Sequence, residues 1–302
     1  MDWSTIFNVG TLMNTVNSAT IVILAGLGCL MTDQAGMMNI GIDGIMTAGA
    51  FAAVMGSWLC NSWVMGLVFA VATGLLFGLF YGVFVIKFKS DEFIIGVALN
   101  IFAAALTTFL LRSIPGQSGS FHPETGTVVK LPSISLGTIG GTQVNISIMV
   151  ILGWILVLAC WVMLYRTPLG FWLHASGEHP ESLRSVGRRP EGLKYLASLL
   201  CGVFCGLSGA YLSLGYLSTF TEKMSASKGY VAVACVIFGR SNPPLVFLAA
   251  LLFGFIDAAG QRMQGVIDPT LTATFPYIGT ILMMVLLAVR DNLKKRRAPA
   301  GN

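Results

Sequence analysis

The chain has 302 residues, of which 55% are hydrophobic and only 10% are charged. Soluble domains carry about 25% charged residues, so this composition excludes an ordinary soluble domain. The 35 glycines favour membrane helices that pack backbone against backbone. The net charge of +5 does not indicate nucleic-acid binding, because five basic residues lie in the last thirteen positions, after an apolar run, as on the cytoplasmic side of a membrane.

The expected membrane spans follow from runs of about 20 apolar residues. In chain order they are 14–31, 38–60, 62–86, 91–111, 144–165, 195–217, 229–239, 243–262 and 271–289. Three of them, 14–31, 38–60 and 229–239, are weaker or broken. The sequence therefore predicts an all-α polytopic membrane protein with eight to ten transmembrane helices, nine by this count, and an external N-terminus.

Basic residues set the expected orientation of these spans. Lys87 and Lys89, Arg166, the stretch 184–194 and the tail 290–302 all fit the cytoplasmic side. The loop 112–143, rich in Gly, Ser, Thr and Pro, then lies outside, with Arg112 and Lys130 as its only basic residues.

Two of the spans are interrupted by polar and glycine-rich sequence. TDQAGMMNIGIDG (32–44) separates the first two spans, and STFTEKMSASK (218–228) precedes the short apolar run GYVAVACVIFG (229–239). As a helix, that eleven-residue run covers about 16 Å, or half a bilayer, so the residues before it must enter the membrane region as irregular backbone. Broken segments in two oppositely oriented halves are typical of the translocation path of a transporter.

Four polar residues in these regions are candidates for the translocation path: Asn39, Asp43, Glu222 and Asp257. An aspartate inside a membrane helix costs about 3 kcal/mol, so it normally faces a cavity or a partner. For Asp257, a polar conduit and a bond to a neighbouring helix are equally good interpretations. A cap or packing role is favoured for Asp43, and Asn39 is expected to cap a helix beginning near Ile40. Glu222 either guards the entrance or is a solvated loop charge.

The sequence holds no recognisable catalytic set. Its three histidines, at positions 122, 174 and 179, lack metal-ligand spacing, and the six cysteines have neither zinc-like pairing nor a disulfide framework, so we expect small core residues. GxxxxGK[ST] is absent, so any ATP must be bound by another subunit. Asp91 and Glu92 begin a span, where acids complement the positive end of a helix. We therefore predict no enzymatic activity, no metal site and no cofactor on this chain.

The most charged internal stretch is GEHPESLRSVGRRPEGLKYL (177–196), which lies between two spans on the expected cytoplasmic side. Pro180 favours the first position of a helix, and Gly187 favours its end. The sequence thus predicts a short polar helix at the membrane surface. From the residues alone, a docking segment and a plain solvated loop are equally good interpretations.

Three blocks carry a resemblance to a known family: MTDQAGMMNIGIDGIMTAGAFAA (31–53), GEHPESLRSVGRRPEGLKYLASLLCGVFCGLSGAYLSLG (177–215) and KGYVAVACVIFGRSNPPLVFLAALLFGFIDA (228–258). They resemble the permease subunits of bacterial ABC importers, closest to the simple-sugar and nucleoside branch, which is related to the branched-chain amino-acid and ribose permeases. The resemblance runs from about residue 15 to 289. Asp43 stands where much of the nucleoside branch carries Glu, so the resemblance implies the family more firmly than the branch.

The resemblance implies a coupling helix that is seated in a groove of an ATPase subunit. The residues it assigns to this role are Gly177, Glu178, Pro180, Glu181, Leu183, Arg184 and Gly187. It also implies three partners: a cytoplasmic ATPase, which holds ATP and Mg, an external substrate-binding lipoprotein, and a second permease subunit that is a longer paralogue or an identical copy.

The prediction is a single permease domain over 1–302, with a coupling segment at 174–194, an external loop at 112–143 and a cytoplasmic tail at 290–302. It would be the transmembrane subunit of an ATP-driven importer in a bacterial plasma membrane, which passes a nucleoside or simple sugar delivered by an external binding protein. The alternative is a secondary transporter of small polar solutes, driven by an ion gradient, in which Asp257 would be the coupling carboxylate.

Overall fold

The computed structural model describes residues 9–121, 129–139, 142–263 and 278–279. Its elements in chain order are α2 (Val9–Gln34), α3 (Ile42–Cys60), α4 (Trp63–Gly82), η1 (Val83–Lys87), α5 (Glu92–Ser113), β1 (Ser120–Phe121), β2 (Ser133–Ile139), β3 (Thr142–Ser147), α6 (Ile148–Arg166), α7 (Pro168–Glu178), α8 (Pro180–Ser185), α9 (Pro190–Ala210), η2 (Tyr211–Tyr216), β4 (Phe220–Thr221), α10 (Lys228–Phe238) and α11 (Pro243–Met263).

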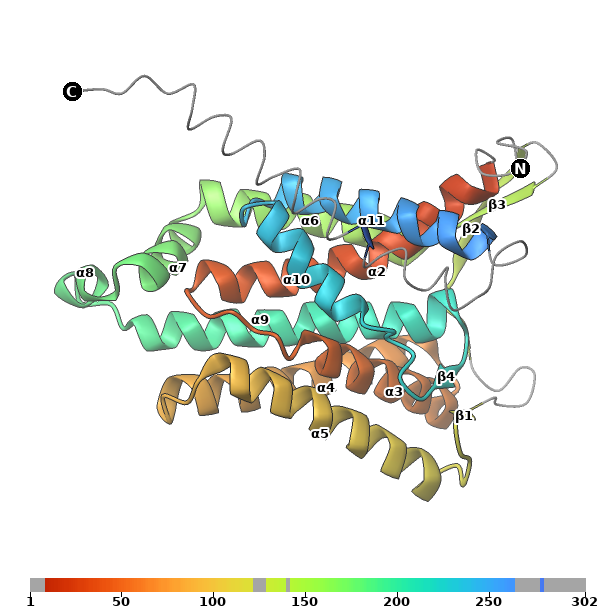
Figure 1. The fold of residues 1–302 in the computed structure, drawn as a ribbon, viewed down its shortest axis with the longest axis horizontal. Coiled ribbons are helices and arrows are strands. Elements are labelled where there is room, and N and C mark those ends of the chain that lie inside the picture. Colours follow the sequence, from red (N-terminus) through yellow and green to blue (C-terminus); the bar gives the residue numbers. More distant parts are fainter. Residues whose placement is uncertain (1–8, 122–128, 140–141, 264–277, 280–302) are drawn as a thin grey trace.

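Seven of the described helices are long and apolar enough to cross a membrane, and α10 is a shorter apolar helix. The long helices run roughly side by side, with α7 and α8 at one end of the bundle and the β2–β3 hairpin at the other (Figure 1). The predicted polytopic helical fold is therefore confirmed. The predicted span 271–289 and the tail 290–302 lie outside the described residues, apart from positions 278 and 279.

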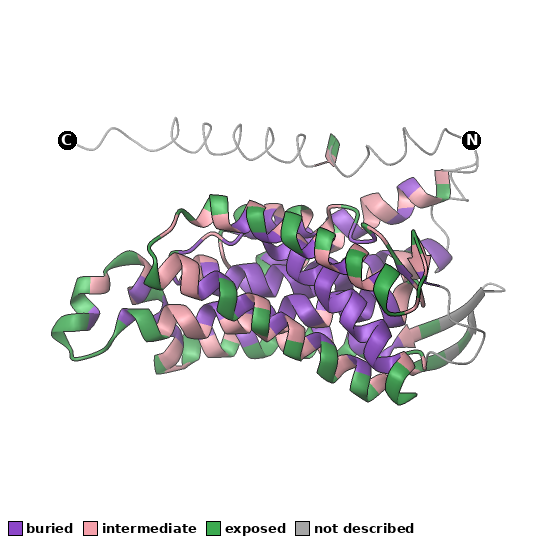
Figure 2. Cartoon of the chain, turned by 90° about the horizontal axis from the view of Figure 1, so that it is seen from below, coloured by how far each residue is buried: buried purple, intermediate pink, exposed green. Residues whose placement is uncertain are grey.

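The core of the bundle is formed by α2, α3 and α9, whose residues are largely buried. Figure 2 shows that buried residues are concentrated in the middle of the bundle. By contrast, α4, α5 and α6 present large apolar side chains on their outer faces. Leu76, Ile101 and Leu158 are 67%, 67% and 62% exposed, respectively. Such exposure suits a surface that faces lipid, because the hydrocarbon core imposes no penalty on an apolar side chain.

Glycines allow α4 and α9 to pack backbone against backbone. A Cβ added to Gly202 of α9 would lie 2.7 Å from the carbonyl carbon of Gly74 on α4, and one added to Gly78 would lie 3.3 Å from the Cα of Gly202. Real Cβ atoms essentially never approach a backbone atom as closely as the first of these distances. The high glycine content therefore has the packing role that composition predicted.

The prediction of an all-α chain missed a hairpin. β2 and β3 pair in antiparallel fashion, with Ser133 opposite Ser147. The span predicted at 144–165 therefore starts too early: the helix begins at Ile148, where the Ser147 hydroxyl accepts a hydrogen bond from the Met149 amide at 3.4 Å. Hydropathy merged the strand with the helix because both are apolar at this boundary.

The cysteines behave as the sequence predicted, with one exception. Five of the six are buried and none forms a disulfide, whereas Cys60, the last residue of α3, is exposed.

Candidate functional site: two broken helices and a coupling segment

The first interruption, called the first break below, comprises residues 35–41 between α2 and α3. Gly36 turns the chain in the left-handed region, with φ of +71°. The chain then returns from the end of the bundle that carries α8 towards the middle, where α3 begins (Figure 1). Asn39 is completely buried, and its Oδ1 accepts a hydrogen bond from the Gly41 amide at 2.8 Å. The prediction that Asn39 caps a helix starting near Ile40 was wrong, because the N-cap position belongs to Gly41.

Side chains from α5 hold the first break at two points. Glu92 accepts a hydrogen bond from the Met38 amide at 2.9 Å. Asn100 accepts one from the Gly44 amide at 2.6 Å and donates one to the Ile40 carbonyl at 3.0 Å. Backbone groups that leave a helix inside a membrane need such partners, because no lipid group can replace them. The sequence analysis missed Asn100, although a lone asparagine in an apolar span is the signal that could have found it.

Asp91 and Glu92 were both predicted to stabilise the start of their helix, but they contact different segments. Asp91 caps α5, since its Oδ1 accepts hydrogen bonds from the Phe93 and Ile94 amides at 2.9 and 3.0 Å. Glu92 reaches instead to Met38 in the first break. The structural role is confirmed for both residues, and for Glu92 the partner lies on a segment that the sequence did not identify.

The second interruption, called the second break, comprises residues 217–227 and leads into α10. Four non-glycine residues adopt left-handed backbone conformations here: Ser218, Lys223, Ala226 and Ser227. The two-residue strand β4 pairs with β1 and ties the segment to the loop after α5. α10 itself has eleven residues, which gives a length of about 16 Å. The predicted irregular backbone followed by a half-length helix is confirmed.

The two breaks meet at Asp43. Its Oδ1 accepts a hydrogen bond from the Gly229 amide at 3.0 Å, and its Oδ2 accepts one from the Ser225 hydroxyl at 2.9 Å. A Cβ added to Gly229 would lie 2.6 Å from the Asp43 backbone nitrogen, so only glycine fits this approach. A carboxylate in the first turn of α3 therefore caps the start of α10. The positive ends of both helices stabilise its charge.

The contacts of Asp43 match the packing role that the sequence favoured. Asn100 adds a second connection between the halves, because its Nδ2 donates to the Tyr230 hydroxyl of α10 at 2.9 Å. The start of α3, the start of α10 and the middle of α5 thus share one polar cluster. Whether Asn39 and Asp43 also contact solute stays a prediction.

Asp257 of α11 lies in a second polar cluster beside the first residue of α10. The Lys228 ammonium is 2.8 Å from its Oδ2, and Ser18 and Gln261 donate to the same oxygen, the latter at 3.2 Å. Of the two interpretations left open, the structure shows the bond to neighbouring helices, and conduit lining stays a prediction. A carboxylate compensated by a lysine is also a poor coupling site for an ion, since it already has its counter-charge.

Glu222 belongs to the connection between the second break and the loop after α5. Its Oε1 accepts a hydrogen bond from the Gly119 amide at 3.2 Å, and its own amide donates to the Gly119 carbonyl at 2.8 Å. These contacts give it a structural function as a tie between two loops. Its proposed position at the entrance of the path stays a prediction.

The predicted surface helix is present as α8. Pro180 occupies the first helical turn, and Gly187 follows the end of the helix with φ of +75°. Leu183 is the one buried residue of α8, so the rest of the helix projects from the bundle. The preceding helix α7 was not predicted: the expected span ended at 165, and α7 follows α6 as a separate helix that begins at Pro168.

Charged groups cover the exposed side of this segment. Arg184 lies between Glu191, at 2.7 Å, and Glu181, at 3.0 Å. The hydrogen bond from Arg184 to Glu191 and the charge of Glu181 raise the pKa of the arginine above its usual value, so it stays charged. Exposed ion pairs contribute little stability, which leaves these groups available to a partner.

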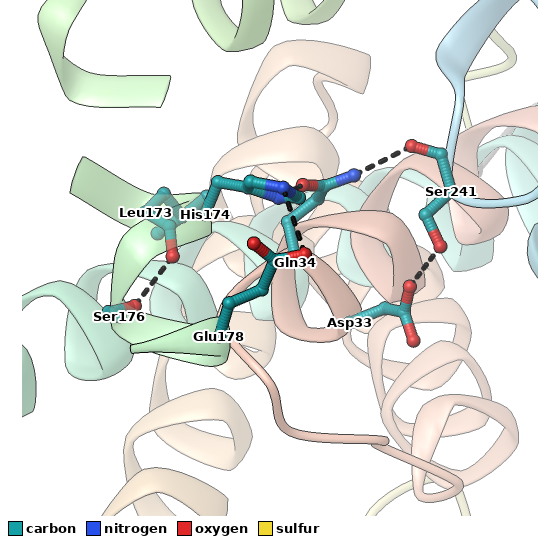
Figure 3. A network of polar contacts seen from close by, with 7 residues as sticks. All are labelled: Asp33, Gln34, Leu173, His174, Ser176, Glu178 and Ser241. Carbon is teal, nitrogen blue, oxygen red and sulfur yellow. Dashed lines mark hydrogen bonds and ion pairs between the residues drawn. The ribbon is translucent and has the colours of Figure 1, made fainter. Parts of the chain in front are cut away.

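The base of the coupling segment contacts the start of the first break, and His174 beside it reaches Gln34 at the end of α2 (Figure 3). A Cβ added to Gly177 would lie 2.7 Å from the Gly36 amide nitrogen, so the two backbones are in contact. Beside them, the His174 Nδ1 is 2.8 Å from the Gln34 Oε1, and its Nε2 is 3.3 Å from Glu178. Gly177, assigned to ATPase coupling by resemblance, thus also contacts the permease itself, whereas Glu178 pairs with His174 on its own helix.

A helical bundle with two interrupted helices and a projecting polar helix is the arrangement of a transmembrane transport protein. Residues 11–289 match the family described as branched-chain amino acid transport system / permease component, and the chain belongs to that family.

Relatives in this family are similar over nearly the whole chain. TsgC13 of Haloferax volcanii, assigned as a glucose ABC transporter permease, is 29% identical over 98% of this chain and 96% of its own length. The guanosine ABC transporter permease NupQ of Bacillus subtilis is 28% identical over 94% and 92%. The nucleoside ABC transporter permease NupC of Lactococcus lactis is 27% identical over 91% and 94%.

A solved structure supports the fold. An inward-facing ABC transporter assigned to the metal-chelate type matches 93% of this chain and 86% of its own, with a TM-score of 0.53 and 14% sequence identity. The chain is thus a multi-pass transport subunit, and its family works with an ATPase and a substrate-binding protein. The family membership supports the ATP-driven prediction and gives no support to the ion-driven alternative.

Proposed function

We propose that this chain forms the translocation pathway of an ATP-driven importer for a nucleoside or a simple sugar. The observation that carries the proposal is the meeting of the starts of α3 and the half-length helix α10 at Asp43, which the Gly229 amide contacts at 3.0 Å. Oppositely directed broken helices that meet inside a bundle can part around a solute without exposing unpaired backbone to lipid.

The chemistry around this meeting point supports a hydroxyl-bearing, uncharged solute. Asp43 has the amide of Gly229 and a serine hydroxyl as partners, and Asp257 is compensated by Lys228. Amide and hydroxyl groups suit the ring hydroxyls of sugars and nucleosides. The names of the relatives, which refer to glucose, guanosine and nucleosides, support the same class. The residues proposed to line the path are Asn39, Asp43, Glu222 and Asp257.

The coupling segment is proposed to seat a cytoplasmic ATPase, which holds ATP and Mg. Its contact residues would be Gly177, Glu178, Pro180, Glu181, Leu183, Arg184 and Gly187. A second permease subunit, either a longer paralogue or an identical copy, would complete the pathway, and an external lipoprotein would deliver the solute. The chain would lie in the plasma membrane with its C-terminus in the cytoplasm.

Charge reversal at Arg184 tests the docking role. In the complex reconstituted in proteoliposomes, Arg184→Glu places a third carboxylate between those of Glu181 and Glu191. This variant should release the ATPase subunit. The matched control is Arg112→Glu, the same reversal at the other end of the bundle, which should leave the ATPase bound. Retention of the ATPase by Arg184→Glu, with unchanged hydrolysis stimulated by solute, would show that α8 does not dock it.

Uptake measurements test the energy source and the solute class. Radiolabelled guanosine and glucose should enter cells in an ATP-dependent way, and an uncoupler should leave uptake intact while ATP is maintained. Uptake that survives ATP depletion and collapses with the uncoupler would instead favour an ion-driven transporter.

A further inference from the structure

Gln34, the last residue of α2, joins three segments that are far apart in sequence. Its Oε1 is 2.8 Å from the His174 Nδ1 on α7, and its Nε2 donates to the Ser241 carbonyl, beyond the end of α10, at 2.7 Å. The residue that follows it begins the first break. One amide side chain therefore contacts the coupling segment and the far end of α10, and it stands at the start of the first break (Figure 3).

The orientation of this amide follows from its partners. A backbone carbonyl only accepts hydrogen bonds, so the Ser241 oxygen must face the NH₂ group of Gln34. The Gln34 oxygen then faces His174, and the Nδ1 of that ring must donate. A flipped amide would bring its oxygen against the Ser241 carbonyl oxygen, and because both groups only accept, that hydrogen bond would be lost.

One backbone contact and one further side-chain hydrogen bond hold this junction. Gly177 of α7 packs directly on Gly36, where an added Cβ on either residue would lie 2.7 Å from the other backbone. Ser241 is held a second time, because its hydroxyl donates to Asp33, the neighbour of Gln34. Two backbones in direct contact cannot move closer together, so a movement of α7 towards Gly36 displaces the start of the first break.

The same junction reaches the meeting point of the two breaks by two routes. One follows the first break from Gly36 to Asp43. The other follows α10 from Ser241 back to Gly229, whose amide donates to Asp43. Since α10 is one continuous helix of eleven residues, a shift of its end near Ser241 moves its start as well.

We propose that Gln34 is the positioning residue that passes movement of the coupling segment to both breaks. This inference rests on the proposed function, since it takes α7 and α8 to be where the ATPase acts. The breaks move because Gln34 holds α7 and the far end of α10 in one hydrogen-bonded junction, and not because the ATPase contacts either break.

The test uses a reporter on the second break of the purified ATPase complex. Lys223→Cys, in a Cys60→Ser background that removes the exposed native thiol, reports access to a hydrophilic maleimide. The labelling rate is compared with and without ATP plus orthovanadate. Gln34→Leu keeps the size of the side chain and removes both hydrogen bonds, and His174→Phe removes the ring donor.

Gln34→Leu should reduce the ATP-dependent change in labelling by about three- to tenfold. The double variant Gln34→Leu/His174→Phe should reduce the labelling change no further than the more severe single variant, because both substitutions remove the contact between Gln34 and His174. Thr32→Val is the matched control: its hydroxyl bonds only the Cys29 carbonyl of the same helix end, at 2.9 Å, so its response should equal that of the parent.

The amount of ATPase that copurifies separates the two proposals. If Gln34→Leu retains the ATPase and the full labelling response, the junction does not transmit movement, while docking by α8 stands. If Thr32→Val loses the response to the same extent, the effect is general loosening of the helix end, and the inference is overturned. If Arg184→Glu retains the ATPase, the proposed docking fails, independently of the behaviour of Gln34.

Discussion

The first break and the second break interrupt the bundle in different ways. The first is seven residues long, and its Asn39 is completely buried. Side chains from a neighbouring helix, Glu92 and Asn100, satisfy its backbone. The second has eleven residues, four of them in left-handed conformations without being glycine, and its Lys223 and Ala226 are exposed.

This difference separates a rigid part of the pathway from a deformable one. Left-handed conformations of non-glycine residues are strained, and exposed turns have few buried contacts to hold them. The second break is therefore the segment that can change shape at low cost. The first break, clamped by α5, moves only together with its neighbours. A rigid first break can transmit displacement from Gly177, while a soft second break can open and close.

The largest expected effect is on the first break. Asn100→Leu leaves the Gly44 amide and the Ile40 carbonyl without their partner inside the bundle. Two unsatisfied, partly buried groups should lower the free energy of unfolding by about 2–3 kcal/mol. Chemical unfolding in mixed micelles measures this change in the free energy of unfolding. Thr107→Val, which removes a hydroxyl bonded only within α5, should change stability far less. Equal losses in the two variants would mean that Asn100 does not clamp the break.

The ion pair at the start of α10 should rank second. Asp257→Leu leaves the Lys228 ammonium without its counter-charge, and the two side chains are only 21% and 16% exposed. Because solvent still reaches them, we expect a loss of about 2 kcal/mol, below the range for fully buried pairs. The double variant Asp257→Leu/Lys228→Met should recover most of it. A double variant as unstable as the single one would show that the site needs polar groups rather than charge balance.

The smallest effect on stability is expected in the second break. Glu222→Ala removes the side-chain contact to the Gly119 amide but leaves the β1–β4 pairing. The free energy of unfolding should change by about 0.5 kcal/mol or less, as for most surface positions. Amide hydrogen exchange in 218–227 should nevertheless become faster. A loss as large as that of Asn100→Leu would remove the distinction between the two breaks.

Local signals in the sequence predicted the features that depend on neighbouring residues. Pro180 and Gly187 bound α8 as expected, since a fixed φ and a left-handed glycine act within one turn. The eleven-residue length of α10 was predicted because the length of an apolar run, which is read directly from the sequence, shows whether a helix can span a bilayer.

Contacts between distant segments were beyond prediction from one sequence. Asp43 was expected to cap or pack, yet its partner Gly229 lies 186 positions away. Asn39 was predicted as the N-cap of α3, but Gly41, two residues later, occupies that position. The Gln34 junction has no local pattern, and the lone asparagine at position 100 stands out in its apolar span without indicating which segment it holds, since both contacts depend on which helices the fold brings together.

Hydrogen exchange followed separately in the two breaks tests the central claim most directly. In the reconstituted complex, amides of the first break, such as Met38 and Gly41, should stay protected with and without ATP plus orthovanadate. Amides of the second break, such as Glu222 and Ala226, should exchange faster and change their rate when the nucleotide is added. Equal protection of the two segments, or a nucleotide response confined to the first break, would contradict the division into a rigid and a deformable part.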